Sequence, residues 1–292
     1  MSRTVMVEGL PGSGKSTTAR GIAAWLAGQR VEVEHWPEGR TDHPVDFEQV
    51  AVLSAADLHA WQSESPATSR ALLGAAEPFG DVWLVRYQAR PGLPPDLVER
   101  LRRRDAYDGD VPVEVHTRVL TDSWRRFGAT EPHAVQVWEC VLLQNPGCAL
   151  VARADRPVDV LRRHVEGLVE AVRAHHPALV YLDTGDPGPA LERAAAERPT
   201  GWLESVIDYH TSQGLGLRCG YRGFDGYVEF MRRRREMELQ ILEGLDLPML
   251  VLPVGDGRWD EHTSAIRAFV ADHVGLDLDG SGVGLPEPLP VA

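Results

Sequence analysis

The chain contains one lysine, Lys15, and this lysine lies in a glycine-rich motif close to the N-terminus. The motif runs Gly9-Leu10-Pro11-Gly12-Ser13-Gly14-Lys15-Ser16-Thr17 and matches the spacing G-x-x-x-x-G-K-[ST] of a phosphate-binding P-loop. All the other residues among the 30 lysines and arginines are arginine. A lysine ammonium is a compact charge on a thin stem, whereas the arginine guanidinium is planar and wide. The choice of lysine at this position therefore favours a loop that encloses phosphate groups.

The residues of the motif predict how phosphates would be held. Its glycines allow positive φ angles, so that successive backbone N–H groups can point inward and form an anion-binding nest. A helix that begins near Lys15 would add its unpaired N–H groups. Lys15 would contact the β- and γ-phosphates, and the Ser16 hydroxyl would bind Mg²⁺. We therefore expect ATP and Mg²⁺ as cofactors, with the nucleotide held by Gly9, Pro11, Gly12, Ser13, Gly14, Lys15, Ser16 and Thr17.

The segments around the motif predict the fold. An apolar strand at 4–8 precedes the loop, and a helix over 17–26 follows it. Strands separated by helices, opened by a P-loop, predict an α/β fold in which a doubly wound, five-stranded parallel sheet carries helices on both faces. The ligand is then expected at the carboxyl ends of the strands. The other predicted strands are 31–36, 134–139, 177–183 and 249–252, and the other main helices are 158–174, 189–198, 228–242 and 262–273.

We predict a single domain over residues 1–275. Within it, 46–133 is expected to be a mainly helical insertion on the substrate side, with helical patterns at 47–58 and 95–104 and a short strand as an alternative at 81–86. A glycine-rich stretch at 208–226 places a lid-like region within 184–226. The remaining residues, 276–292, lack periodicity and are predicted to be a flexible tail.

Charge and targeting signals narrow the class of protein. The net charge of −13 argues against a general nucleic-acid surface or an anionic-membrane surface, although a local arginine pocket remains compatible with it. No signal peptide and no apolar run of membrane-spanning length are recognisable. We therefore expect a cytoplasmic enzyme whose partner is a small molecule, and a homodimer is left open.

Several segments, taken in order, resemble the P-loop nucleoside and nucleotide kinases, most of all the thymidylate kinase and deoxynucleoside kinase branch. The resemblance covers residues 1–40 and about 135–275, and it implies phosphoryl transfer from ATP. One departure is Cys140, which stands where those kinases have an arginine after Glu139. The segments that carry the resemblance are the P-loop at 9–17, Pro37-Glu38-Gly39, Trp138-Glu139, the strand 177–183 with Ala190-Leu191-Glu192-Arg193, and the closing helix and strand at 224–242 and 247–252.

Phosphoryl transfer needs alignment and positive charge around the transferred group, which Lys15 and the loop amides would supply. The resemblance places Arg193 and Arg198 where lid arginines lie, so both are candidates to neutralise the γ-phosphate; a solvated helix face is the alternative. Glu38 is the first candidate for the base that takes a proton from an acceptor hydroxyl, and Asp42 is the second. The alternative for both carboxylates is a loop position or a turn cap.

Glu139 ends an apolar strand, where an unpaired charge would be costly. We expect it to meet Mg²⁺-bound water, an arginine or the substrate, with a structural ion pair as the alternative, so Ser16 and Glu139 form the candidate metal site. Asp183 is a second candidate for the carboxylate beside the metal. Residues that could recognise the acceptor, or could simply cap a turn or fill the core, are Gln144, Asn145, Trp36, Trp61 and Trp138.

The leading hypothesis is an ATP-dependent kinase that moves the γ-phosphate to a small-molecule acceptor, such as a nucleoside-like compound, a hydroxylated metabolite or an antibiotic. The alternatives are a nucleotide-binding regulatory NTPase that acts as a switch through a partner, and a binding module without catalysis. The guanine-reading sequence Asn-Lys-x-Asp is absent, because Lys15 is the only lysine. This absence disfavours the switch.

Overall fold

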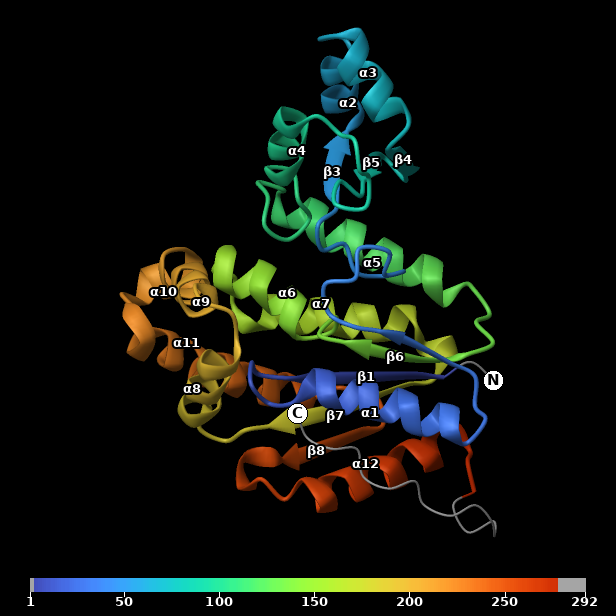
Figure 1. Ribbon diagram of the computed structural model, residues 1–292, viewed down its shortest axis with the longest axis vertical. Coiled ribbons are helices and arrows are strands. Elements are labelled where there is room, and N and C mark those ends of the chain that lie inside the picture. The colour runs from blue at the N-terminus through green and yellow to red at the C-terminus, as the bar shows by residue number, and fades with distance from the viewer. Residues whose placement is uncertain (1–2, 278–292) are drawn as a thin grey trace.

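The computed structural model describes residues 3–277, and a five-stranded parallel sheet forms its centre (Figure 1). The strand order is β2-β6-β1-β7-β8, and every pair of neighbours runs parallel. The predicted doubly wound α/β sheet is therefore confirmed, and β1, all of whose residues are buried, lies in its middle. The strands are β1 (Thr4–Gly9), β2 (Val33–Trp36), β6 (Val135–Glu139), β7 (Pro177–Asp183) and β8 (Met249–Pro253).

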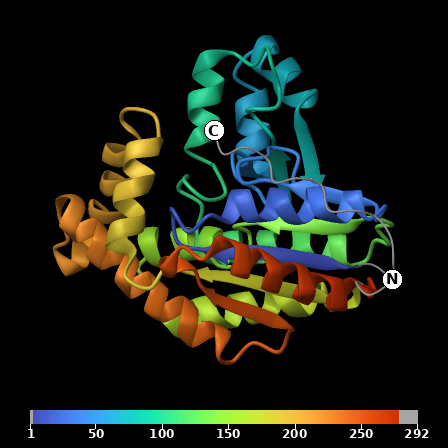
Figure 2. The same ribbon diagram turned by 60° about the horizontal axis from the view of Figure 1, so that its bottom comes forward.

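Helices cover both faces of this sheet. α1 (Lys15–Gly28) and α12 (Trp259–Val274) pack on one face, where they lie next to each other (Figure 2). α5 (Val113–Gly128), α7 (Val158–Ala171) and α11 (Gly223–Leu242) belong to the core on the other face. Because successive side chains of a strand point to opposite faces, Glu139 falls on the α1 face of β6 and Glu8 on the opposite face of β1.

Shorter helices surround the carboxyl ends of the strands. α6 (Gln144–Gly147) and the π-helical turn η1 (Cys148–Arg153) follow β6. α8 (Pro187–Glu197), α9 (Trp202–Thr211) and α10 (Gly214–Cys219) follow β7 and lead into α11. Two 3₁₀ turns, η2 (Arg173–His175) and η3 (Val254–Asp256), precede β7 and follow β8.

The insertion is not as helical as predicted. Besides α5 and three shorter helices, residues 46–133 contain a three-stranded antiparallel sheet in the order β3-β5-β4 (Figure 1). The strand expected as an alternative at 81–86 is present as β5. The helix expected over 47–58 is wrong over 47–54, because β3 occupies 51–54 and α2 begins only at 55. These elements are β3 (Ala51–Ser54), α2 (Ala55–Gln62), α3 (Pro66–Leu73), β4 (Ala76–Phe79), β5 (Val82–Val85) and α4 (Pro95–Arg102).

The physical reason for this error is burial on both sides of β3. Val52 packs in the cluster over α5, whereas its neighbour Leu53 packs in the cluster formed with α2, α3 and α4. A strand buried on both faces is a short continuous apolar run, and periodicity alone cannot separate it from a buried helix. In addition, α5 packs on α7 in the central layers, so the unit that stands apart from the sheet ends before residue 113.

The glycine-rich stretch predicted to be a lid is helical. Gly216 lies within α10, and a Cβ atom placed on it would stand 1.9 Å from the carbonyl oxygen of His210. Here glycine permits two helices to approach closely. From residue 278 on, the predicted tail lies outside the described residues. Among the helices that the structure describes, none is long and apolar enough to cross a membrane.

Candidate functional site

The loop between β1 and α1 has the backbone conformation that its glycines predicted. The φ angles of Gly9, Gly12 and Gly14 are 146°, 79° and 90°. A Cβ atom on Gly9 would stand 2.5 Å from the carbonyl oxygen of Leu182, and one on Gly12 would stand 2.5 Å from that of Ala190. Both the positive φ angles and the lack of space therefore require glycine at these positions.

Lys15 extends its side chain beneath this loop. The side chain is buried, and Nζ donates a hydrogen bond of 3.1 Å to the carbonyl oxygen of Leu10. α1 begins at Lys15, and no side chain of the described residues caps its first turn. The first N–H groups of the helix, the loop amides and the ammonium therefore converge on one place, which can bind an anion such as a phosphate.

Glu139 lies beside the start of α1 and is almost fully buried. Its Oε1 accepts a hydrogen bond of 2.7 Å from Nε2 of His35 on β2, and its carboxylate also accepts one from the Ser16 hydroxyl. Burial raises the pKa of Glu139, whereas the hydrogen bonds from His35 and Ser16 lower it. Together with the charge of His35, these bonds outweigh burial, so the pKa lies below its ordinary value. The carboxylate is therefore ionised, and His35 is the partner that the sequence did not reveal.

The predicted metal residues Ser16 and Glu139 are thus brought together, and they fit a Mg²⁺ ion bound with a nucleotide. Within residues 3–277, no hydrogen-bond partner reaches Oε2 of Glu139. No group of three His, Cys, Asp or Glu side chains in the same part of the chain could hold a metal by itself. Mg²⁺ usually keeps several waters and binds through one or two protein oxygens plus substrate phosphates. The Ser16 hydroxyl and the Glu139 carboxylate supply this kind of partial ligand set.

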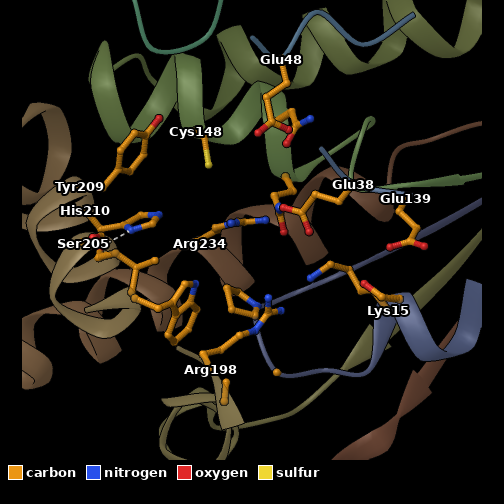
Figure 3. A pocket seen from close by; sticks show the side chains of 18 of the residues that line it. Lys15, Glu38, Glu48, Glu139, Cys148, Arg198, Ser205, Tyr209, His210 and Arg234 are labelled. Carbon is orange, nitrogen blue, oxygen red and sulfur yellow. Dashed lines mark hydrogen bonds between the residues drawn. The ribbon is translucent and has the colours of Figure 1, made fainter. Parts of the chain in front are cut away.

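A cavity of about 720 Å³ opens from the P-loop (Figure 3). Lys15 and Glu139 lie at one end of it, Glu48 lies along the insertion side, and Tyr209 and His210 from α9 face the P-loop end. Its lining combines six P-loop residues with residues of α6, α8, α9 and α11. The lining residues are Pro11, Gly12, Gly14, Lys15, Ser16, Thr17, Pro37, Glu38, Glu48, Tyr107, Asp108, Glu139, Gln144, Asn145, Cys148, Ala194, Glu197, Arg198, Trp202, Ser205, Val206, Tyr209, His210, Tyr227 and Arg234.

Glu38 lies between the two halves of the cavity, between Glu48 and Lys15 in the view of Figure 3. The amide of Gln144 donates to its Oε1, and the Cys140 thiol donates to its Oε2 over 3.4 Å. Cys140, which stands where the resemblance implied an arginine, is fully buried and has a φ of 65°. Gln144 thus contacts the candidate base Glu38, whereas the sequence had left open whether it recognises the acceptor or caps a turn.

A buried carboxylate holds the Gln144 loop against the P-loop strand. Glu8 on β1 accepts hydrogen bonds from the backbone N–H groups of Leu142, Leu143 and Gln144, at 2.7, 3.1 and 3.2 Å. Burial raises the pKa of Glu8 to about 7, and the nearby carboxylate of Glu238 adds to this rise. β1, which leads into the loop at 9–17, and the loop that contains Gln144 are thereby fixed to each other.

The insertion contributes acidic and phenolic groups that sequence reasoning missed. The Asp105 carboxylate accepts the N–H groups of Tyr107 and Asp108, at 2.9 and 3.0 Å, and this turn places both residues at the cavity. Asp46 lies behind them and accepts a hydrogen bond of 3.0 Å from Asn145. Burial raises the pKa of Asp46 to about 6 and that of Glu48 to about 7, and neighbouring carboxylates contribute to the rise for Glu48. The aspartates around Tyr107 were the available sequence signal.

Two arginines line the cavity. Arg198 was predicted, and its guanidinium lies over the ring of Trp202 at 5.6 Å from the ring centroid. Arg234 was not predicted; it is 5 % exposed, and its Nε donates a hydrogen bond of 2.6 Å to Glu238. Arg234 belongs to a run of four arginines on α11, and helical spacing places it with the buried Met231 and Glu238. That spacing was the signal that could have identified it.

Other predicted site residues lie elsewhere. Asp42 is exposed and pairs with Arg40 at 2.5 Å, and Arg193 is exposed on α8; neither lines the cavity. Asp183 binds Arg235 at 2.6 Å, which disfavours a role beside the metal. The tryptophans considered for stacking do not line the cavity either: Trp138 is fully buried in the core, Trp36 donates to Gln136, and Trp61 lies in the insertion under Arg100.

Neither a protein-family model nor a curated protein matches this chain. The function is therefore argued from the geometry of the site.

Proposed function

We propose that the protein is an ATP-dependent kinase of the P-loop class that transfers the γ-phosphate to a hydroxyl group of a small molecule. The observation that carries this proposal is one continuous cavity. It joins the loop around Lys15 to a second wall of hydrogen-bonding side chains, which includes Glu48, Tyr209 and His210. Glu38 stands between this loop and this wall. A cavity of this size and composition is typical of a small-molecule site.

The residues of the chain have distinct roles in this reaction. Lys15 and the loop amides hold and neutralise the phosphates, and Arg198 adds charge at the same end. Mg²⁺, when bound at Ser16 and Glu139 together with the phosphates, would neutralise charge on the transferred group. Glu38 takes the proton of the acceptor hydroxyl while the oxygen of that hydroxyl forms a bond to the γ-phosphorus. The bond between that phosphorus and the bridging oxygen of the β-phosphate breaks, and ADP leaves.

A regulatory NTPase is the second candidate function, but the second wall of the cavity favours a kinase. A switch needs to position only a water molecule beside the γ-phosphate, whereas this cavity reaches Tyr209 and His210 on α9. A cytoplasmic location, an exclusively small-molecule partner and a homodimer remain predictions.

The first test is ATP turnover with Mg²⁺ against a panel of nucleosides, nucleoside monophosphates, sugars, aminoglycosides and phenols. ADP release should rise when an acceptor is present, and Lys15→Met should reduce the stimulated rate on the order of 100-fold, because a positioned charge is lost at the transferred phosphate. Arg20→Met, an exposed position on the same helix, is the matched control. Tight ATP binding without stimulation by any acceptor would contradict a kinase and favour the switch.

A further inference from the structure

We propose that the acceptor is an organic cation, an amino-hydroxy compound whose protonated amine binds an acidic wall formed by Glu38, Asp46, Glu48 and Asp108. The proposal rests on the kinase function for the fate of the hydroxyl group, but not for the binding of the amine. Glu38, Glu48 and Asp108 line the cavity, and the buried Asp46 adds its negative charge from outside the lining, where it accepts a hydrogen bond from the lining residue Asn145.

The four carboxylates of the acidic wall lack a charged partner. Among the ion pairs of the described residues, none involves any of the four. The side-chain donors near three of them are neutral. Asn145 donates a hydrogen bond to Asp46, Gln144 and the Cys140 thiol donate to Glu38, and the phenols of Tyr107 and Tyr209 lie near Asp46 and Asp108. By contrast, exposed carboxylates such as Asp42 and Glu64 are paired with arginine.

The cations of the cavity are already engaged at other places. Lys15 lies under the phosphate loop, and Arg198 stands at the same end of the cavity. Arg234 forms an ion pair with Glu238, so the carboxylate of Glu238 already neutralises its charge. The acceptor half of the cavity therefore contains carboxylates with no cation beside them. Buried carboxylates without a counter-ion are costly, and a bound cation would remove that cost.

Two buried donors provide an independent indication of a ligand. Nη2 of Arg234 and the hydroxyl of Tyr227 make no hydrogen bond within residues 3–277. Arg234 is 5 % exposed and Tyr227 is fully buried, yet both residues line the cavity. Buried donors normally have an acceptor. Oxygen atoms of a ligand would provide one, so the compound should carry hydroxyl or carbonyl oxygens toward α11 and its amine toward the acidic wall.

The chemistry of the wall favours an organic cation over a metal ion. In the described part of the chain, no three His, Cys, Asp or Glu side chains come close enough to hold a metal. Glu38, Glu48 and Asp108 are spread along the cavity surface, and their neighbours include phenol and amide groups. Such a surface can hold an ammonium group through separate hydrogen bonds, whereas a nucleoside monophosphate would bring its negative charge against this wall.

The test measures binding without ATP, by calorimetry at pH 7 and constant ionic strength. The probes are matched pairs that differ in charge: glucosamine against glucose, and kanamycin against its tetra-N-acetyl derivative, with thymidine 5′-monophosphate as the anion. The cationic member of at least one pair should bind at least tenfold more tightly than its neutral partner. Equal or tighter binding of the neutral or anionic probes, or no binding of either amine, would overturn the proposal.

Variants locate the bound amine. Glu48→Gln should weaken binding of the amine about tenfold, and Asp108→Asn provides a second variant if the first does not fold. Glu64→Gln, an exposed glutamate of the insertion, is the control and should leave binding unchanged. Amine binding without phosphorylation would reject the kinase and retain this inference. If only neutral or anionic acceptors are phosphorylated, the kinase proposal stands and the inference of a bound amine is rejected.

Discussion

The contact between His35 and Glu139 gives the sharpest prediction for a single residue. The imidazole donates to a carboxylate that lies almost fully buried beside Ser16, so it fixes the direction of the remaining oxygen. Residues that orient a metal ligand typically contribute 10- to 100-fold in metal affinity. His35→Ala should therefore raise the Mg²⁺ concentration for half-maximal ATP turnover by about tenfold or more.

The control for this variant is His59→Ala, because His59 is exposed on α2 in the insertion. Titration of both variants with Mg²⁺ at saturating ATP gives the comparison. If His35→Ala titrates like the native chain, His35 does not orient Glu139 and the pair is only structural.

At the same scale, some site residues could be predicted from the sequence, because strand ends meet at one edge of a parallel sheet. This reasoning located Ser16, Glu38 and Glu139 correctly at the cavity. It failed for Asp42, because Arg40, two residues away, binds its carboxylate. It could not identify Arg234, because Arg234 lies on α11 and not at a strand end; only its helical spacing with Met231 and Glu238 pointed to a buried position.

At the scale of elements, the contact between α5 and α7 controls how the insertion sits on the sheet. Gly128 ends α5, and a Cβ atom on it would stand 2.0 Å from the carbonyl oxygen of Ala171. Gly128→Ala would force the two helices apart, and overpacking of this kind costs about 2 kcal/mol. The melting temperature and the urea midpoint should both fall.

Gly167→Ala is the matched control, because Gly167 lies inside α7 with no atom within 4 Å of its Cβ position. This change should stabilise the protein by about 0.5–1 kcal/mol, since alanine favours helix more than glycine does. A Gly128→Ala variant as stable as the native chain would show that the two helices can adjust at no cost.

Strands could be predicted from the sequence where their hydrophobic pattern and their position next to helices both indicated a strand. Four strands of the central sheet are apolar segments and β2 is an alternating one, and each of the five lies next to a helix along the chain, so sequence and structure agree on them. β3 and β4 were not found. Each has four residues, and β3 is held by pairing with β5, a partner about 30 residues away. Such pairing leaves little trace in a single short run of residues.

For the whole molecule, two sets of buried groups change the free energy of unfolding in opposite directions as the pH changes. Burial lowers the pKa of His43 and His164 to about 3 and that of His116 and His210 to about 4. These histidines are neutral when folded, so their contribution to stability is lost as the pH falls below their ordinary value of 6.5. Glu8, Asp46 and Glu48 have raised pKa values, and their contribution is lost as the pH rises through about 6 to 7.

We therefore expect the free energy of unfolding to vary little between pH 6 and pH 7.5, and replacing one carboxylate should reveal the balance. Glu8 is protonated at pH 5 but must carry a buried charge at pH 8, whereas a glutamine is neutral at both values. Relative to the native chain, Glu8→Gln should gain about 2 kcal/mol of stability between pH 5 and pH 8. Urea unfolding at the two pH values measures this gain, with the exposed Glu99→Gln as control. The difference in free energy of unfolding between Glu8→Gln and the native chain could instead be the same at both pH values. In that case Glu8 has an ordinary pKa, and its charge is held between β1 and the Gln144 loop at no cost to stability.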